Sequence, residues 1–146
     1  MGIVDDLLGS PGLYVGKDTV VGTDLVGAAR IQVSVLPGGA GVAIDYEILN
    51  GLAPGPVLGH IEHTLIGKAD DGTTIMVIAH THGGGITILR ETQPGVFEPG
   101  DGPTPYPMKV VLSVPEPGKL RHAWWYGSPG DDAVERDVAQ LEIVTQ

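Results

Sequence analysis

The sequence predicts a single all-β domain: an antiparallel up-and-down (meander) barrel of roughly eight to ten strands with a short helix at its start. Apolar and polar residues alternate with period two along much of the chain, as in strands that are exposed to solvent on one face and buried on the other. The 23 glycines and 12 prolines fall between these stretches, as turn residues do. No helical stretch of about a dozen residues, the length of a parallel crossover, separates the strands.

The expected elements follow one another at hairpin spacing within one domain, residues 1–146. A helix is expected over residues 3–8, because three apolar side chains share one side and Gly-Ser-Pro-Gly follows. Residues 29–36 and 41–49 alternate strictly, and Pro-Gly-Gly-Ala at 37–40 predicts the turn between them. The other expected strands are 13–15, 19–24, 57–67, 74–82, 86–91, 108–114, 119–127 and 134–144, with a loop over 93–107 and a turn over 83–85. Closure as a barrel is favoured over a sandwich because it removes exposed strand edges.

The apolar side of each strand is expected to face the interior. The aliphatic residues assigned to the inside are Ile31, Val33, Val35, Val42, Ile44, Ile48, Ile61, Leu65, Ile86, Ile88, Met108, Val110, Leu112 and Leu120. The polar and aromatic side chains on the same faces, hence the candidate ligand contacts, are Tyr46, His63, Arg90, His122, Trp124 and Tyr126. Arg90 leads this group, because a buried guanidinium needs a partner such as a ligand carboxylate. The alternative is that Arg90 lies at the barrel mouth and extends into water.

The histidines raise the question of a metal site. His80 and His82 share a face of a strand, as in the His-x-His pair of the cupin metal motif. The glutamate that follows in cupins would fall at Ile86 or Thr87, where this chain has no carboxylate. His60 and His63 point to opposite faces of a strand. We therefore expect no bound metal and no other cofactor.

Composition excludes several classes of protein. With no cysteine, the chain has neither disulfides nor a thiolate nucleophile. A net charge of −10 with only eight lysines and arginines argues against a nucleic-acid partner. No apolar stretch approaches the roughly 20 residues of a membrane span, and the acidic start does not match a signal peptide, so a cytoplasmic location is expected. The serines lack a hydrolase motif.

The chain starts with an expected helix that runs into Leu8-Gly9, continues with Gly12 and Gly16, and ends its meander in a long strand. This order of elements resembles the calycin superfamily of lipocalins, fatty-acid-binding proteins and nitrobindin-like barrels. The resemblance is architectural and implies a ligand inside the barrel. The lipocalin Gly-x-Trp is replaced by Gly12-Leu13-Tyr14, and the Arg-x-Tyr of fatty-acid-binding proteins by Arg136-Asp137-Val138. Residues 128–132 lack the histidine that would hold haem in a nitrobindin-like barrel.

These observations predict a binding protein for a small apolar or amphipathic molecule, lipid-like or aromatic, with a carboxylate as one option for its polar group. The alternative is a barrel-type enzyme, an isomerase, cyclase or hydratase, in which His63 or His122 moves a proton. An acid–base pair of His122 with Asp137 belongs to this alternative. A filled barrel acting through its acidic surface, and association as a homodimer, stay open.

Overall fold

The computed structural model describes residues 2–50, 57–82, 85–100, 104 and 106–145. These residues form a helix, α1 (Ile3–Gly9), a 3-10 turn, η1 (Pro37–Gly39), and ten strands. In chain order the strands are β1 (Gly12–Val20), β2 (Val26–Val35), β3 (Gly41–Asn50), β4 (Val57–Lys68), β5 (Thr74–His80), β6 (Ile86–Gln93), β7 (Val96–Pro99), β8 (Met108–Ser113), β9 (Lys119–Tyr126) and β10 (Val134–Ile143). Within the described ranges, both helical segments fall far short of the length and apolarity that a membrane-spanning helix needs.

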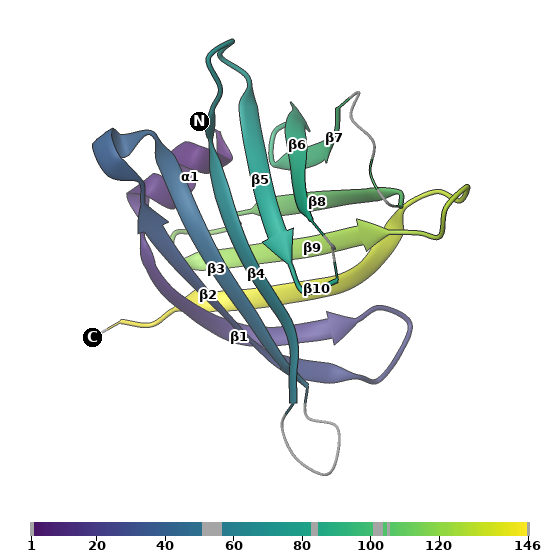
Figure 1. Ribbon diagram of the computed structural model, residues 1–146. Helices are drawn as coiled ribbons and strands as arrows, with labels where there is room; N and C mark the ends of the chain where they lie inside the picture. Colours follow the sequence, from purple (N-terminus) through teal and green to yellow (C-terminus); the bar gives the residue numbers. More distant parts are fainter. Residues whose placement is uncertain (1, 51–56, 83–84, 101–103, 105, 146) are drawn as a thin grey trace.

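The strands close into an antiparallel barrel, in which each strand pairs with its neighbour in sequence and β10 pairs with β1 (Figure 1). The predicted fold class is therefore confirmed. Two element predictions are wrong. Residues 13–15 and 19–20 belong to one strand, β1, whereas residues 21–24 of the second expected strand form a turn before β2. The loop expected over 93–107 contains β7. The expected turn over 83–85 lies largely outside the described residues.

A glycine permits the barrel to close. Gly16 on β1 lies opposite Leu141 on β10, and its backbone approaches β10 so closely that a Cβ atom would collide with the carbonyl oxygen of Gln140. A residue with a side chain at position 16 would therefore push the first and last strands apart.

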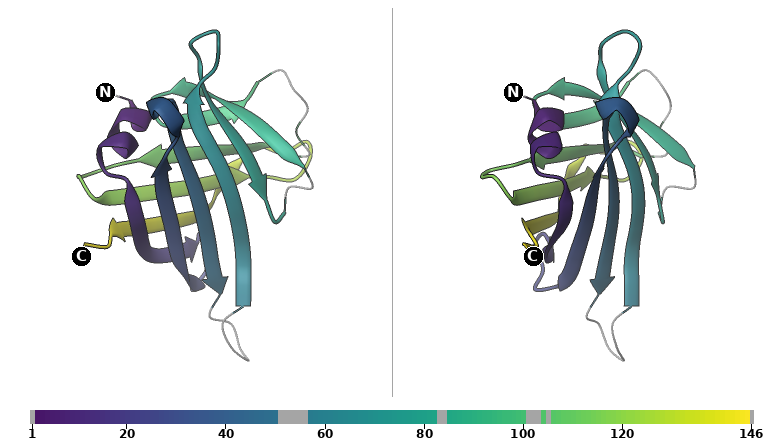
Figure 2. Two further views of the ribbon diagram at one scale, coloured as in Figure 1. Left: turned by 60° about the vertical axis from the view of Figure 1, so that its left-hand side comes forward. Right: turned by 90° about the vertical axis from the view of Figure 1, so that its left-hand side faces the viewer.

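The core fills the barrel, and the helix covers one end of it. Ile3 and Leu7 of α1 are buried with the inward side chains of the strands, and α1 lies against β3 (Figure 2). The aliphatic positions expected to face inward on β3, β8 and β9 are buried, including Ile44, Val110 and Leu120. Because α1 leads into the start of β1, it covers that end of the barrel, and the end where β1 finishes has no helical cover among the described residues.

Two strands face the opposite way from the prediction. On β4, Ile61 and Leu65 are exposed, and on β6, Ile86 and Ile88 are 74% and 56% exposed. Both strands carry apolar residues on each face, so alternation alone does not assign the inward side. The neighbouring strands decide it: on β6, Leu89 lies opposite buried Met76 of β5 and is itself fully buried. Val35, also expected inside, is exposed at the end of β2.

The inward assignments of His63 and Arg90 are wrong for the same reason. The His63 side chain is 72% exposed and contacts Asp45 on β3, and the Arg90 side chain is 49% exposed. Arg90 Nη1 donates to Asp71 Oδ2 at 3.4 Å, outside the barrel. On β4 the inward positions are the polar His60, Glu62 and Thr64, opposite the inward positions of β3.

Candidate functional site

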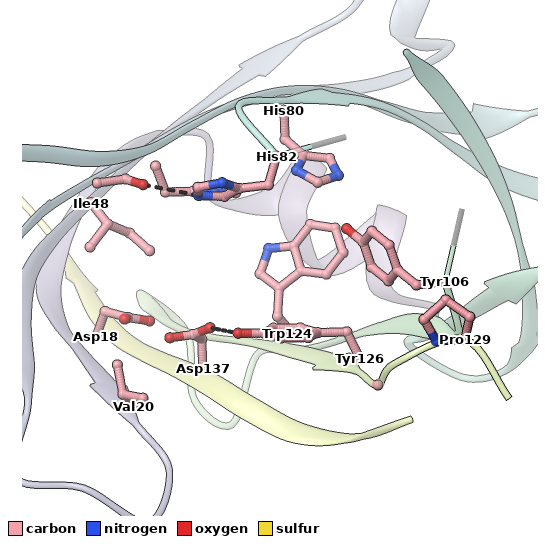
Figure 3. Close-up of a pocket in the computed structure, with 13 residues that line it drawn as sticks. Asp18, Val20, Ile48, His80, His82, Tyr106, Trp124, Tyr126, Pro129 and Asp137 are labelled. Atoms are coloured by element: carbon pink, nitrogen blue, oxygen red, sulfur yellow. Dashed lines mark hydrogen bonds between the residues drawn. The ribbon is translucent and has the colours of Figure 1, made fainter. Parts of the chain in front are cut away.

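A cavity of about 520 Å³ opens at the end of the barrel opposite α1. Its walls carry three kinds of side chain: aromatic rings, imidazoles and carboxylates (Figure 3). These are Tyr106, Trp124 and Tyr126; His60, His80 and His82; and Asp18 and Asp137. The side chains come from β1, β4, β5, β9 and β10 and from loop positions beside them, so barrel closure brings together residues far apart in sequence.

The aromatic wall is built mainly by β9. Trp124 and Tyr126 are two residues apart and so share the inward face of the strand, while Tyr106 packs edge-on against Tyr126 with ring centroids 6.3 Å apart. The Trp124 indole is 5% exposed, and its Nε1–H donates to Glu62 Oε1 at 3.2 Å. Trp124 is thus fixed in orientation, whereas Tyr126, 37% exposed, stands at the mouth.

The imidazole wall comes from β4 and from the end of β5. The ring centroid of His60 lies 5.8 Å from those of both His80 and His82. His82 Nε2–H donates to the carbonyl oxygen of Gly59 at 3.1 Å. Both ring nitrogens of His80 are buried and have no hydrogen-bond partner among the described residues. Burial lowers the pKa of His80, which keeps its ring neutral at neutral pH.

Two carboxylates face each other on the opposite side of the cavity (Figure 3). Asp137 points inward because β10 has a bulge between Glu135 and Asp137, and it accepts a hydrogen bond from Tyr126 Oη at 3.2 Å. Asp18 is 3% exposed and accepts a long hydrogen bond, 3.5 Å, from Tyr46 Oη. Burial and the nearby Asp137 raise the pKa of Asp18 to about 6.

A third carboxylate, Glu62, lies behind the cavity in the core and is 1% exposed. It accepts hydrogen bonds from Trp124 and from Thr64 Oγ1, the latter at 2.6 Å, while His60 Nε2 lies 3.3 Å away and His122 Nε2 3.7 Å away. Burial acts to raise the pKa of Glu62, but His122, His60 and Thr64 outweigh it and hold this pKa well below its usual value. Glu62 therefore stays ionised and organises the residues beneath the cavity.

Four of the six sequence-predicted contact residues lie in or beneath this site. Trp124 and Tyr126 line the cavity, whereas Tyr46 and His122 are buried beneath it, with ring centroids 4.6 Å apart. His63 and Arg90, on the outer surface, have no part in the site. Of the acid–base pair considered from the sequence, Asp137 lines the cavity, and His122 Nε2 instead faces Glu62.

Sequence reasoning missed Asp18, Tyr106 and Glu62, and did not assign His60 to the interior. For β4 a signal was present: the polar residues at 60, 62 and 64 alternate with period two and share one face. Burying such a face requires partners from other strands, which alternation cannot reveal. Asp18 and Tyr106 had no comparable signal.

The arrangement has a definite chemical capacity. The imidazole of His80 and the carboxyl group of Asp18, whose pKa is about 6, can exchange protons, and the aromatic wall can stack on an apolar ligand. Among the residues that the structure describes, no group of three or more histidine, aspartate or glutamate side chains is arranged to hold a metal ion.

Comparison of the chain with protein-family models and with curated protein sequences gave no match.

Proposed function

We propose that this protein binds a small molecule with an apolar or aromatic body in the open end of the barrel. The observation that carries the proposal is the cavity of about 520 Å³ with its aromatic wall. Ligand pockets usually have volumes of about 300–1,000 Å³ and combine apolar walls with a few polar groups. The meander barrel, led by a short helix, also supports the proposal that the chain is a calycin.

The side chains of the cavity support binding in a defined orientation. Trp124 is held by Glu62 and offers a fixed ring on which an apolar ligand can stack. Asp18 is buried at the cavity, and its hydrogen bond from Tyr46 is long. Both ring nitrogens of His80 are buried without a hydrogen-bond partner in the described part of the chain. Polar groups in this state gain most when a ligand supplies the missing partners.

A neutral fluorescent probe tests this proposal. N-phenylnaphthylamine, which brightens in apolar surroundings, is expected to bind saturably at one site per chain. In the Val20→Trp variant the new ring would fill part of the cavity that Val20 lines and weaken binding by about tenfold or more. Val15→Trp is the matched control, because Val15 lies on the same strand but is exposed on the outer face.

Two results would contradict the proposal: no saturable binding by the unaltered chain, or equal affinities in the two variants. Native mass spectrometry of protein purified from its own host is the complementary measurement. A retained small molecule, absent from the Val20→Trp variant, is the expected result.

A barrel-type enzyme is the second candidate. One observation favours it: His80, whose ring nitrogens have no hydrogen-bond partner among the residues that the structure describes, lines the same cavity as Asp18, whose pKa is about 6. His63 cannot take the catalytic role considered from the sequence, because its side chain is on the outer surface. Incubating the protein with its retained ligand in excess separates the candidates. Conversion to a product, lost in His80→Ala, would establish catalysis, and recovery of unchanged ligand would favour binding alone.

A further inference from the structure

We propose that the ligand of this cavity is an organic cation, a molecule with an apolar or aromatic body and an ammonium group that lies between Asp18, Asp137 and the aromatic wall. This inference rests on the proposed binding function and specifies its ligand class. It also replaces the carboxylate-bearing ligand considered from the sequence.

The charges around the cavity support a cation. No lysine or arginine is among the described residues that line it, whereas two carboxylates are. The arginine that would have held a ligand carboxylate, Arg90, is paired with Asp71 outside the barrel. Arg136, which precedes Asp137 in the chain, is exposed, and its Nε–H donates to the backbone oxygen of Tyr126. An anionic ligand would therefore meet like charges, and a cationic one would neutralise them.

The aromatic rings support the same conclusion. Tyr106, Trp124 and Tyr126 line the cavity beside the carboxylates (Figure 3). The faces of aromatic rings attract cations, and several rings around one ammonium group are a recurring mode of recognition. Tyr126 already attracts one cation in this way, because the Arg136 guanidinium carbon lies 5.8 Å from its ring centroid.

Among the described residues that line the cavity, Asp18 has no lysine or arginine as a partner. Asp18 is 3% exposed, and the hydrogen bond that its carboxyl group accepts from Tyr46 Oη is long, 3.5 Å. An ionised carboxylate buried this deeply needs a countercharge or strong donors. An ammonium group in the cavity would provide both, and Asp137 across from it would accept a second hydrogen bond.

Binding of a cation should then depend on pH. The groups that face Asp18 are Asp137 on β10, His122 on β9, Tyr46 on β3 and His60 on β4. Since the pKa of Asp18 is about 6, acidification protonates Asp18 and removes its attraction for the ligand. Protonation of His80, whose pKa is lowered by burial, would also repel a cation at acidic pH. Asp18→Asn separates the two contributions, because only the histidine contribution persists in that variant.

The experiment compares three probes with one indole body and different charges: tryptamine is cationic, tryptophol neutral and indoleacetate anionic. Each probe is titrated by calorimetry and by displacement of N-phenylnaphthylamine at about pH 7.5. We expect tryptamine to bind about ten- to hundredfold more tightly than tryptophol, as for a charge-assisted hydrogen bond at a partly buried site, and indoleacetate to bind most weakly. Between about pH 7 and about pH 5 the tryptamine affinity should fall at least several-fold, while that of tryptophol stays constant.

The matched variants are Asp18→Asn and Asp137→Asn, with Asp45→Asn on the outer face as control. Each inner substitution should reduce the preference for tryptamine over tryptophol about tenfold, and the control should not change it. Retained binding of N-phenylnaphthylamine shows that a variant is folded with its cavity intact. If an inner variant loses that binding, the pH dependence of the unaltered chain decides the inference.

The possible failures are distinguishable. Suppose that N-phenylnaphthylamine binds. Equal affinities for the three indoles, a preference for indoleacetate, or no displacement by any of them would then overturn the inference of a cationic ligand. The proposed binding function would still stand. If N-phenylnaphthylamine itself does not bind, the proposed function fails, and the inference fails with it.

Discussion

Replacing Asp18 by asparagine is expected to stabilise the protein at neutral pH. The folded structure raises the pKa of this carboxyl from its ordinary 3.8 to about 6, through burial and the proximity of Asp137. Its ionised form is therefore disfavoured in the folded state, and folding binds a proton between these two pKa values. Asparagine has nearly the same shape, can still accept from Tyr46 and carries no charge.

The magnitude follows from the pKa difference. Each pKa unit corresponds to about 1.4 kcal/mol, so ionised Asp18 lowers the free energy of unfolding by up to about 3 kcal/mol at about pH 7. Asp18 borders a cavity that is open to solvent, which screens the charge, and we reduce the expected gain to about 1–2 kcal/mol. For a chain of this length that gain raises Tm by about 2–8 °C.

The sign of the pH dependence makes this prediction specific. A raised pKa gives stability that is fully present below the unfolded-state pKa and is lost as pH rises through about 6. The advantage of Asp18→Asn should therefore vanish below about pH 3, where both states of the unaltered protein carry a protonated Asp18, and be complete above about pH 7.

Urea unfolding at these two pH values measures the difference. Asp45→Asn, an exposed acid on the outer face of β3, is the control and should change the free energy of unfolding by less than about 0.5 kcal/mol. The reasoning is refuted if Asp18→Asn destabilises the protein at about pH 7, or if its effect is the same at both pH values. A stabilising substitution in a cavity is the pattern expected where a residue is kept for function.

Further predictions concern the core, the barrel seam and the outer surface. Glu62→Gln should lower the free energy of unfolding, measured in urea, by about 2–3 kcal/mol, because the amide cannot accept from all the donors that now reach the carboxylate. Glu47→Gln, at a partly exposed position, is the control and should lower that free energy by less than about 0.5 kcal/mol. Gly16→Ala should lower Tm markedly, because the new Cβ atom would collide with β10. Gly85→Ala is the control and should leave Tm unchanged, because there is open space at its Cβ. Similar melting curves for the two variants would show that β10 can shift to accept the Cβ atom. Arg90→Met should leave the affinity for N-phenylnaphthylamine unchanged within about twofold, and a larger loss would argue that Arg90 reaches the cavity.

Much of the fold could be predicted from alternation in the sequence. Strand β3, with Val42, Ile44 and Ile48 inward, and strand β8, with Val110 inward, each have one apolar face, so a single register buries them. Glycine and proline marked most of the turns. The short strand β7 escaped prediction because its four residues, Val-Phe-Glu-Pro, carry too little pattern to separate them from a loop.

The candidate site could be predicted only in part. Trp124 and Tyr126 follow the clear alternation of β9 and were assigned to the inside correctly. Asp137 faces inward because of a bulge, a one-residue irregularity that reverses the facing of the residues after it. Arg90 was misplaced because Ile86 and Ile88, apolar but exposed, suggested the wrong face of β6.

The sequence by itself therefore determined the class of fold, because period-two alternation and turn residues act over distances of a few residues. It determined equally that stability must come from the core without disulfides, since the chain has no cysteine. Only the tertiary structure decided which face of β4 and β6 is inside and which polar groups meet at the cavity. Those outcomes depend on register between strands: Glu62 is buried because its partners Trp124 and His60 converge on it after the barrel closes. Contacts between residues so far apart in the chain produce no periodic pattern in the sequence. The acidic and aromatic character of the cavity therefore follows only from the tertiary structure.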